Sequence, residues 1–121
     1  MSTIDLTEDA FSAAISNHPI VLIDFWAAWC GPCRSFAPIF EAASAEHTDI
    51  LFAKVDTEAQ RSLAAAAEIT SIPTLMGFRD GVLIYSQPGA LPAARLHDLI
   101  GKIRELDMDH VREQLRSSES R

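Results

Sequence analysis

Cysteine is scarce in this chain: its 121 residues include two, Cys30 and Cys33, with Gly31 and Pro32 between them. A structural zinc site takes four ligands, usually from two Cys pairs or from a Cys pair and a closely spaced His pair. The sequence has no second Cys pair, and its four histidines lie far apart, at positions 18, 47, 97 and 110. We therefore expect no bound metal ion.

Positive charge is also in short supply. The chain has 10 Lys and Arg against 17 Asp and Glu, which gives a net charge of −7. Nucleic acids and anionic membranes attract basic proteins and repel acidic ones. The composition therefore argues against either as a partner.

Long apolar runs are missing too. A transmembrane helix needs about 18 or more consecutive apolar residues, and the sequence has no such stretch. The segment from Met1 to Asp9 lacks the basic start and the apolar stretch of a signal peptide. The expected location is the cytoplasm, where a close Cys pair is more often catalytic or metal-binding than a structural disulfide.

The length and the hydrophobic content of 48% suit one domain with its own core. The segment from Thr57 to Gln60 has the pattern of a capping box, which would open the third helix. Residues 107–116 either extend the last helix or form a weak separate turn, and residues 117–121 are expected to fray. Strands are expected at 3–6, 20–26, 50–55, 74–78 and 82–85, and helices at 7–17, 34–47, 57–67 and 92–106.

The predicted order is β-α-β-α-β-α-β-β-α, which indicates a three-layer α/β/α sandwich. The apolar run Ile20–Trp26, broken only by Asp24, is typical of a central parallel strand covered on both faces. An Asp-Gly turn at 80–81 marks a hairpin that adds an antiparallel strand, so the sheet is mixed. The two cysteines follow the central strand, at the carboxyl edge where sites in open α/β sheets tend to lie.

The Cys pair has the spacing of a redox site, because two thiols within one helical turn can close a small disulfide ring. Cys30 is expected at a helix N-terminus, where free N–H groups and the helix dipole favour the thiolate. It is thus the expected nucleophile, and Cys33, one turn further and more buried, would resolve the mixed disulfide. Pro32 fixes one backbone angle, Gly31 leaves room for a substrate, and Trp29 offers an apolar wall. Two inert core cysteines are the alternative, which the flanking Gly, Pro and Trp disfavour.

Asp24 is a single carboxyl group in an otherwise apolar strand. Burial would raise its pKa, and the group would then be able to take the proton of Cys33 through a water molecule. A buried ion pair with Lys54, the one charge in the neighbouring strand, is an alternative that is compatible with this role. From the residues alone, the functional and the structural interpretations of Asp24 are equally favoured.

Ile72 and Pro73 stand at the head of a later strand. Only about 5–6% of X-Pro bonds are cis, so the dipeptide by itself predicts a trans bond. A cis bond would turn the backbone of Ile72 toward the cysteines, where an extended substrate segment would be able to pair with it. Gly89 has the local pattern of an ordinary turn residue.

Together these residues resemble the thioredoxin family over about residues 3–106. The features that carry the resemblance are Val21 to Cys33 with Asp24 and Trp-Cys-Gly-Pro-Cys, Pro38, Lys54-Val-Asp56, Ile72-Pro73-Thr74, Gly81 and Gly89-Ala90. Ala28 departs from the pattern, since many members carry a polar residue there. The resemblance implies a thioredoxin domain over residues 1–106, with residues 107–121 as a C-terminal extension that is partly helical or frayed.

The resemblance implies a thiol-disulfide oxidoreductase that reduces protein disulfides and serves electron transport and cell redox homeostasis. It implies no bound cofactor, with electrons from NADPH through thioredoxin reductase, disulfide-containing client proteins and a monomer. It also implies a cis bond before Pro73, a proton-transfer role for Asp24 that Lys54 tunes, and a docking surface formed by Trp29, Ile72, Pro73 and Gly89. The alternatives are a binding or chaperone module that acts independently of its thiols, and an oxidase or isomerase. The Gly-Pro pair and the missing signal peptide count against the last of these.

Overall fold

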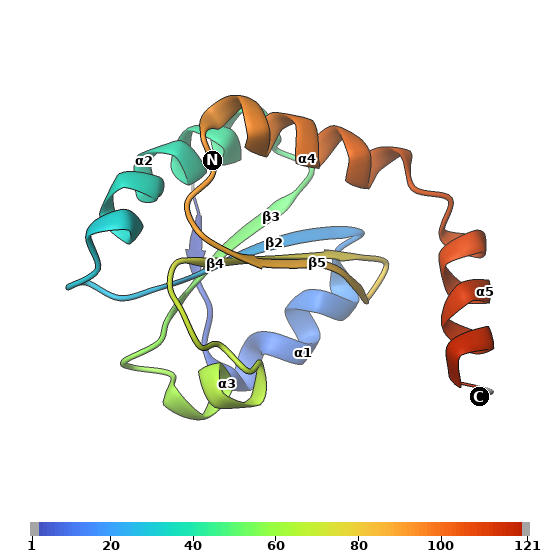
Figure 1. The fold of residues 1–121 in the computed structure, drawn as a ribbon, viewed down its shortest axis with the longest axis horizontal. Coiled ribbons are helices and arrows are strands. Elements are labelled where there is room, and N and C mark those ends of the chain that lie inside the picture. The colour runs from blue at the N-terminus through green and yellow to red at the C-terminus, as the bar shows by residue number, and fades with distance from the viewer. Residues whose placement is uncertain (1–2, 120–121) are drawn as a thin grey trace.

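A five-stranded mixed sheet forms the middle layer of the protein, which we describe from a computed structural model over residues 3–119 (Figure 1). The strands lie in the order β1-β3-β2-β4-β5. Strands β1, β3 and β2 are parallel, whereas β4 is antiparallel to both of its neighbours. The bounds are β1 Ile4–Asp5, β2 Ile20–Trp26, β3 Leu51–Asp56, β4 Thr74–Arg79 and β5 Val82–Pro88.

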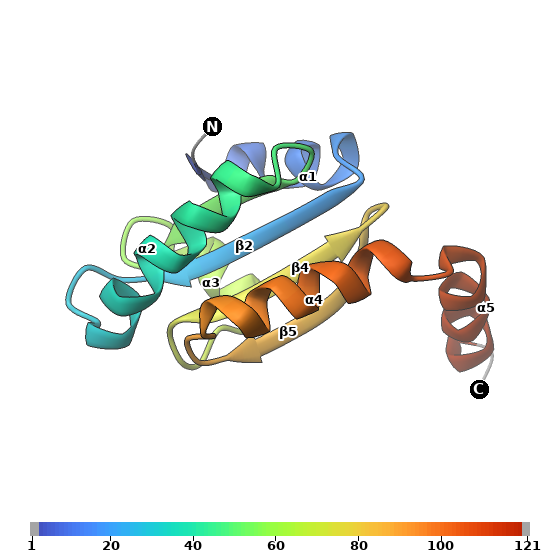
Figure 2. The ribbon, with the colours of Figure 1, turned by 90° about the horizontal axis from the view of Figure 1, so that it is seen from above.

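Helices cover both faces of this sheet, as the sandwich prediction required. Helices α2 and α4 lie on one face and α1 and α3 on the other (Figures 1 and 2). Strand β2 sends Ile20 and Leu22 to the core under α2 and α4, and Val21 and Ile23 to the core under α1 and α3. The helices are α1 Glu8–Asn17, α2 Gly31–Glu46, α3 Arg61–Ala66, α4 Ala93–Glu105 and α5 Met108–Glu119.

The direction of β4 differs from the parallel core that strand–helix alternation predicted. The connection between β3 and β4 does not return along the sheet, and β4 begins at the edge where β2 and β3 end, with Thr74 opposite Phe25. This placement brings Pro73 to the edge that carries the cysteines.

The capping-box prediction for Thr57 and Gln60 is wrong. The Thr57 hydroxyl donates to the carbonyl oxygen of Trp26 at 3.0 Å. The carboxylate of Asp56 instead accepts the two amides that follow Thr57, at 2.9 and 3.3 Å. Residues 57–59 therefore form a turn, and the helix begins only at Arg61, with Gln60 as its N-cap.

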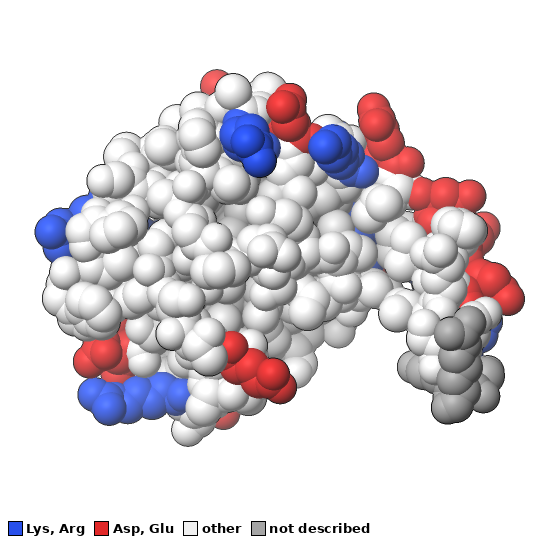
Figure 3. Space-filling model, viewed as in Figure 1, with Lys and Arg blue, Asp and Glu red and all other residues white. Residues whose placement is uncertain are grey.

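The C-terminal segment forms a separate helix, α5, rather than an extension of α4. It projects beyond the end of the sheet (Figures 1 and 2), and its first residue, Met108, is 6% exposed. Residues 117–119, which were expected to fray, are part of this helix, while residues 120–121 of the predicted tail lie outside the described range. Acidic side chains gather on α5 and along the adjoining rim, and the middle of this face carries none (Figure 3). None of the described helices combines the length and apolarity needed to cross a bilayer.

Candidate functional site

The two cysteines lie at the start of α2 and form a disulfide, with their Cα atoms 5.2 Å apart. Cys30 is the N-cap residue of the helix, and its Sγ accepts the backbone N–H of Cys33 at 3.2 Å. Pro32 stands in the first turn, where backbone N–H groups have no partner within the helix. The N–H that proline lacks therefore costs no hydrogen bond there. The remaining free amides and the helix dipole stabilise negative charge at the Cys30 sulfur.

The two cysteines are almost equally buried. Cys33 was expected to be more buried, and the exposed fractions are 3% for Cys30 and 2% for Cys33, a difference too small to tell the two residues apart. In this disulfide form both sulfurs belong to a small apolar cluster with Ala27, which Trp26 and Ile72 flank. What distinguishes Cys30 is its position at the helix end, because its sulfur accepts an N–H of the first turn.

The loop before β4 lies against this disulfide. The Ile72–Pro73 bond is cis. The family resemblance implied this cis bond, whereas the dipeptide by itself predicted a trans bond. The Sγ of Cys30 lies 3.7 Å from the carbonyl oxygen of Ile72. Gly89 joins the same loop, because its N–H donates to the carbonyl oxygen of Pro73 at 2.8 Å.

The surface around the disulfide is open and partly apolar. Trp29 is 69% exposed, the highest value among the large apolar side chains of the described residues. Gly31 and Gly89 are also exposed. Gly89 has a φ of +104°, a conformation in which any side chain would be strained. A Cβ at Gly31 would meet only the end of the Arg34 side chain, at 3.9 Å, so packing does not require glycine there.

Asp24 lies in the middle of β2 and is completely buried. Neither of its carboxylate oxygens has a hydrogen-bond partner among the described residues. Burial raises the pKa of Asp24 to about 6, although the positive charge of Lys54 lowers it in part. Alternation along β2 puts Asp24 on the same face as Leu22, the face that α2 covers. The carboxyl group is therefore on the side of the sheet where α2 carries Cys33.

The ion pair between Asp24 and Lys54, which the sequence offered as an alternative, does not form. The two residues are directly opposite in the register of β2 and β3. The Lys54 ammonium instead lies 4.9 Å from the centroid of the Trp26 ring, where it makes a cation–π contact. Lys54 and Trp26 both line a hollow of about 380 Å³ between β3 and the start of α1. Lys54 thus acts on Asp24 through its electric field rather than through a hydrogen bond.

Trp26 is a site residue that sequence reasoning did not single out. It carries the Lys54 ammonium on its ring and flanks the sulfur cluster. Its indole Nε1 is buried without a partner among the described residues, like the Asp24 oxygens. The sequence placed Trp26 at the end of the central strand before the Cys pair and among the residues that carry the family resemblance, but gave it no role in the site.

The comparisons with known proteins agree with this geometry. The thioredoxin family model matches residues 2–102. The "Putative thioredoxin 2" of Streptomyces coelicolor is 54% identical over 111 residues, which cover 92% of this chain and 83% of that protein. Bacillus subtilis thioredoxin is 37% identical over 103 residues, with 84% and 98% covered. The solved structure of a mutant thioredoxin from Halobacterium salinarum has a TM-score of 0.78 at 35% identity and covers 86% of this chain and 91% of its own.

A family match over most of the chain and a disulfide at the Cys-Gly-Pro-Cys segment lead to one conclusion. The chain is a thiol-disulfide oxidoreductase that acts as a protein-disulfide reductase, and it belongs to the thioredoxin family.

Proposed function

We propose that Cys30 is the attacking residue. Its thiolate attacks one sulfur of a client disulfide, so that a Cys30–client disulfide forms and the other client sulfur leaves as a thiolate. The position of Cys30 at the N-cap of α2 supports this role, because the helix end stabilises the thiolate. The disulfide at the start of α2 is the observation that carries the proposal.

In the second step Cys33 resolves the mixed disulfide. Asp24 takes the proton of the Cys33 thiol through a water molecule, and the new thiolate attacks the sulfur of Cys30. The Cys30–Cys33 disulfide forms, the second client sulfur leaves, and the client has gained two electrons. The pKa of Asp24, about 6, supports a proton acceptor that works near neutral pH. The Asp24 oxygens have no hydrogen-bond partner among the described residues. This supports a bridging water molecule, because buried polar atoms without protein partners are usually hydrated.

Clients dock on the open surface around the disulfide. Trp29 supplies exposed apolar area, and the backbone of Ile72 offers hydrogen bonds to an extended segment. Pro73 and Gly89 hold that backbone in place through the 2.8 Å hydrogen bond between them. Gly31 and Pro32 shape the approach to the sulfur of Cys30.

Electrons reach this protein from NADPH through a thioredoxin reductase, and it holds no cofactor of its own. It works as a monomer in the cytoplasm on disulfide-containing proteins, and so contributes to electron transport and redox homeostasis. Residues 1–106 form the functional domain, and residues 107–121 are an accessory extension. The family membership supports the reductase as electron donor.

A thiol-independent binding module is not favoured. Such a module would need neither the intact Cys pair nor a buried carboxyl group beside it, and this chain has both.

NADPH-coupled reduction of insulin in the presence of a thioredoxin reductase tests the proposal. Wild-type protein is expected to sustain NADPH oxidation, and Cys30→Ser to abolish it. Failure of the wild-type protein with active reductases, including the reductase of its own organism, would contradict the proposed electron source. Failure to reduce insulin with dithiothreitol as electron donor would contradict the reductase activity itself.

A further inference from the structure

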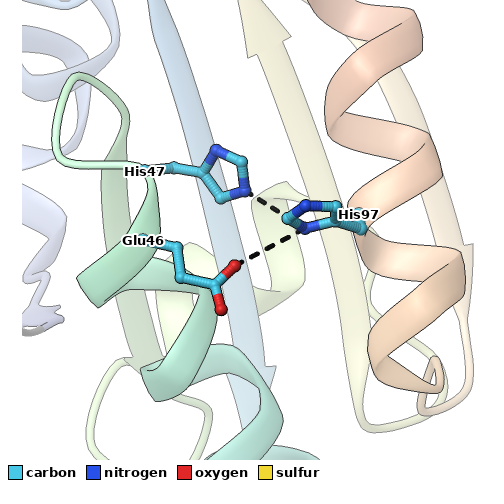
Figure 4. A group of neighbouring side chains, drawn as sticks. All are labelled: Glu46, His47 and His97. Carbon is cyan, nitrogen blue, oxygen red and sulfur yellow. Dashed lines mark hydrogen bonds and ion pairs between the residues drawn. The ribbon is translucent and has the colours of Figure 1, made fainter.

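Three potential metal ligands meet between the end of α2 and the middle of α4, away from the disulfide. Figure 4 shows Glu46 and His47, at the end of α2, both directed toward His97 of α4. The Nδ1 atom of His97 lies 3.3 Å from Nε2 of His47 and 3.8 Å from Oε2 of Glu46. One ligand atom from each side chain lies within 4.8 Å of the others.

These separations are close to those in a tetrahedral metal site. Zinc binds imidazole nitrogen and carboxylate oxygen at about 2.0–2.2 Å, so two ligand atoms of a tetrahedron are about 3.4 Å apart. The His47–His97 separation of 3.3 Å already matches this value. The Glu46 side chain is 64% exposed and His97 57% exposed, so small rotations suffice to close the remaining distances.

The backbone around these side chains is fixed by the core. Leu96, next to His97, is 1% exposed, and Ala43 of α2 is 8% exposed. The amide of His47 donates to the carbonyl oxygen of Ala43 at 3.0 Å, which ties the end of α2 to its last turn. A hollow of about 250 Å³ lies between the two helices beside Glu46 and His97. The backbone positions of the three ligands are thus fixed, and their side chains are accessible to solvent.

Arg104 opposes a metal ion at this place. Its guanidinium is held by Asp49 at 2.6 and 3.0 Å and also donates to Nδ1 of His47 at 3.1 Å. That hydrogen bond places the proton of a neutral His47 ring on Nε2, the atom that faces His97. Metal binding through Nε2 moves this proton to Nδ1, so the contact with Arg104 must open while Arg104 stays bound to Asp49.

We propose that Glu46, His47 and His97 form a binding site for a divalent transition-metal ion such as Zn²⁺, with the fourth position open to water. Imidazole and carboxylate suit Zn²⁺ and Cu²⁺ better than Ca²⁺ or Mg²⁺. The proposal differs from the expectation, drawn from the sequence, that the chain binds no metal ion. That expectation considered spacing along the sequence, whereas α4 brings His97 back beside His47 across 50 positions.

Titration calorimetry with ZnCl₂ tests the proposal on tag-free protein with its disulfide intact, so that no thiolate competes for the metal. One ion is expected to bind per chain. Loss of a supporting group near a metal already costs roughly 10- to 100-fold in affinity, and we expect His47→Ala and His97→Ala each to weaken binding at least as much. His110→Ala, a change on α5, is the matched control and is expected to bind as the wild type does.

Arg104→Met makes the test specific, because it removes the competing donor and a positive charge without touching a ligand. This variant is expected to bind Zn²⁺ more tightly than the wild type, and loss of binding in it would contradict the ligand set. Unchanged binding in each of the variants His47→Ala and His97→Ala, or the absence of binding to the wild type, would overturn the proposal.

Thermal unfolding without metal checks that each variant is folded. A melting temperature that Zn²⁺ raises in the wild type, and not in the two histidine variants, would support the site independently.

Discussion

Asp24 and Lys54 face each other across β2 and β3, yet the Lys54 ammonium lies over the Trp26 ring rather than on the Asp24 carboxylate. The carboxyl group is left buried and without a direct partner among the described residues. A paired carboxylate would be held ionised well below neutral pH, whereas this one has a pKa of about 6. Burial is therefore what raises the pKa of Asp24 toward neutral pH, and Lys54 opposes it only through its electric field.

The first prediction concerns the stability of Asp24→Asn. The pKa of Asp24 rises from 3.8 to about 6 on folding. The folded state therefore binds more protons than the unfolded state between about pH 4 and pH 6, and stability rises as the pH falls through this window. Above the window the buried charge costs about 3 kcal/mol. We expect Asp24→Asn to be more stable than the wild type at pH 8 by about 1–3 kcal/mol, with the advantage vanishing near pH 4.

Guanidinium unfolding of the oxidised protein at pH 4, 6 and 8 measures this difference. Asp98→Asn, a change at an exposed position of α4, is the control and should leave the pH profile as it is. If Asp24→Asn exceeds the wild type in stability by the same amount at pH 4 and pH 8, the buried charge of Asp24 is not the cause of the difference.

The second prediction concerns Lys54→Met, which keeps an apolar chain against Trp26 and removes the charge. Because the positive charge of Lys54 lowers the pKa of Asp24, the pKa should move above 6 in the variant. Titration of the Asp24 carboxyl carbon by NMR measures the shift directly. A pKa that stays unchanged or falls would mean that Lys54 does not act on Asp24 through its field.

Much of the site was predictable because its signals are local. The spacing of Cys30 and Cys33, the proline between them and the preceding apolar strand require only a strand–helix junction. The lone carboxyl of Asp24 in that strand stands out for the same reason. The cis bond at Pro73 was predictable only from the family resemblance, since nothing local distinguishes it from the common trans bond.

What the sequence did not predict depends on contacts between distant segments. Lys54 contacts the Trp26 ring rather than Asp24 because of a geometry that residue types do not specify. His47 and His97 meet only because α2 and α4 cover the same face of the sheet. The capping box at Thr57 failed because its hydroxyl binds the end of β2, a partner 31 residues away. Local patterns therefore predicted the elements, and tertiary packing decided their polar partners.

The third prediction assigns the two thiols. Cys33→Ser should accumulate a stable mixed disulfide on Cys30, because the resolving thiol is gone. Cys30→Ser should accumulate none under the same conditions. Mass spectrometry of tryptic fragments after reaction with a disulfide-containing client measures both. An adduct recovered on Cys33 of the Cys30→Ser protein, with none on Cys30 of the other variant, would reverse the assignment.

The fourth prediction tests the docking surface through Trp29. This side chain is 69% exposed, so Trp29→Ala should change the stability by less than about 1 kcal/mol. A tryptophan at the centre of an interface often contributes about 2 kcal/mol or more, so kcat/KM for insulin should fall by about thirtyfold or more. Leu83→Ala, on β5 and 47% exposed, is the matched apolar control and should retain the wild-type value. Equal losses in the two variants would argue against a docking role specific to Trp29.

The last prediction is that residues 107–121 can be removed without loss of the reductase. The end of α4 does not depend on α5, because the Arg79 guanidinium donates to the carbonyl oxygen of Ile103 at 2.7 Å. Helix α5 itself contributes the buried Met108 and an ion pair between Arg112 and Asp80 at 3.5 Å. Burial of a methionine contributes about 1.5–3 kcal/mol and a surface ion pair at most about 1 kcal/mol.

Deletion of these residues should therefore lower the melting temperature by several degrees and leave kcat/KM for insulin unchanged. Met108→Ala in the full chain should reproduce most of the loss of stability, because Met108 is the apolar contact of α5 that is most completely buried among those described. A truncated protein that unfolds without a cooperative transition, or that loses activity while still folded, would show that α5 belongs to the functional domain.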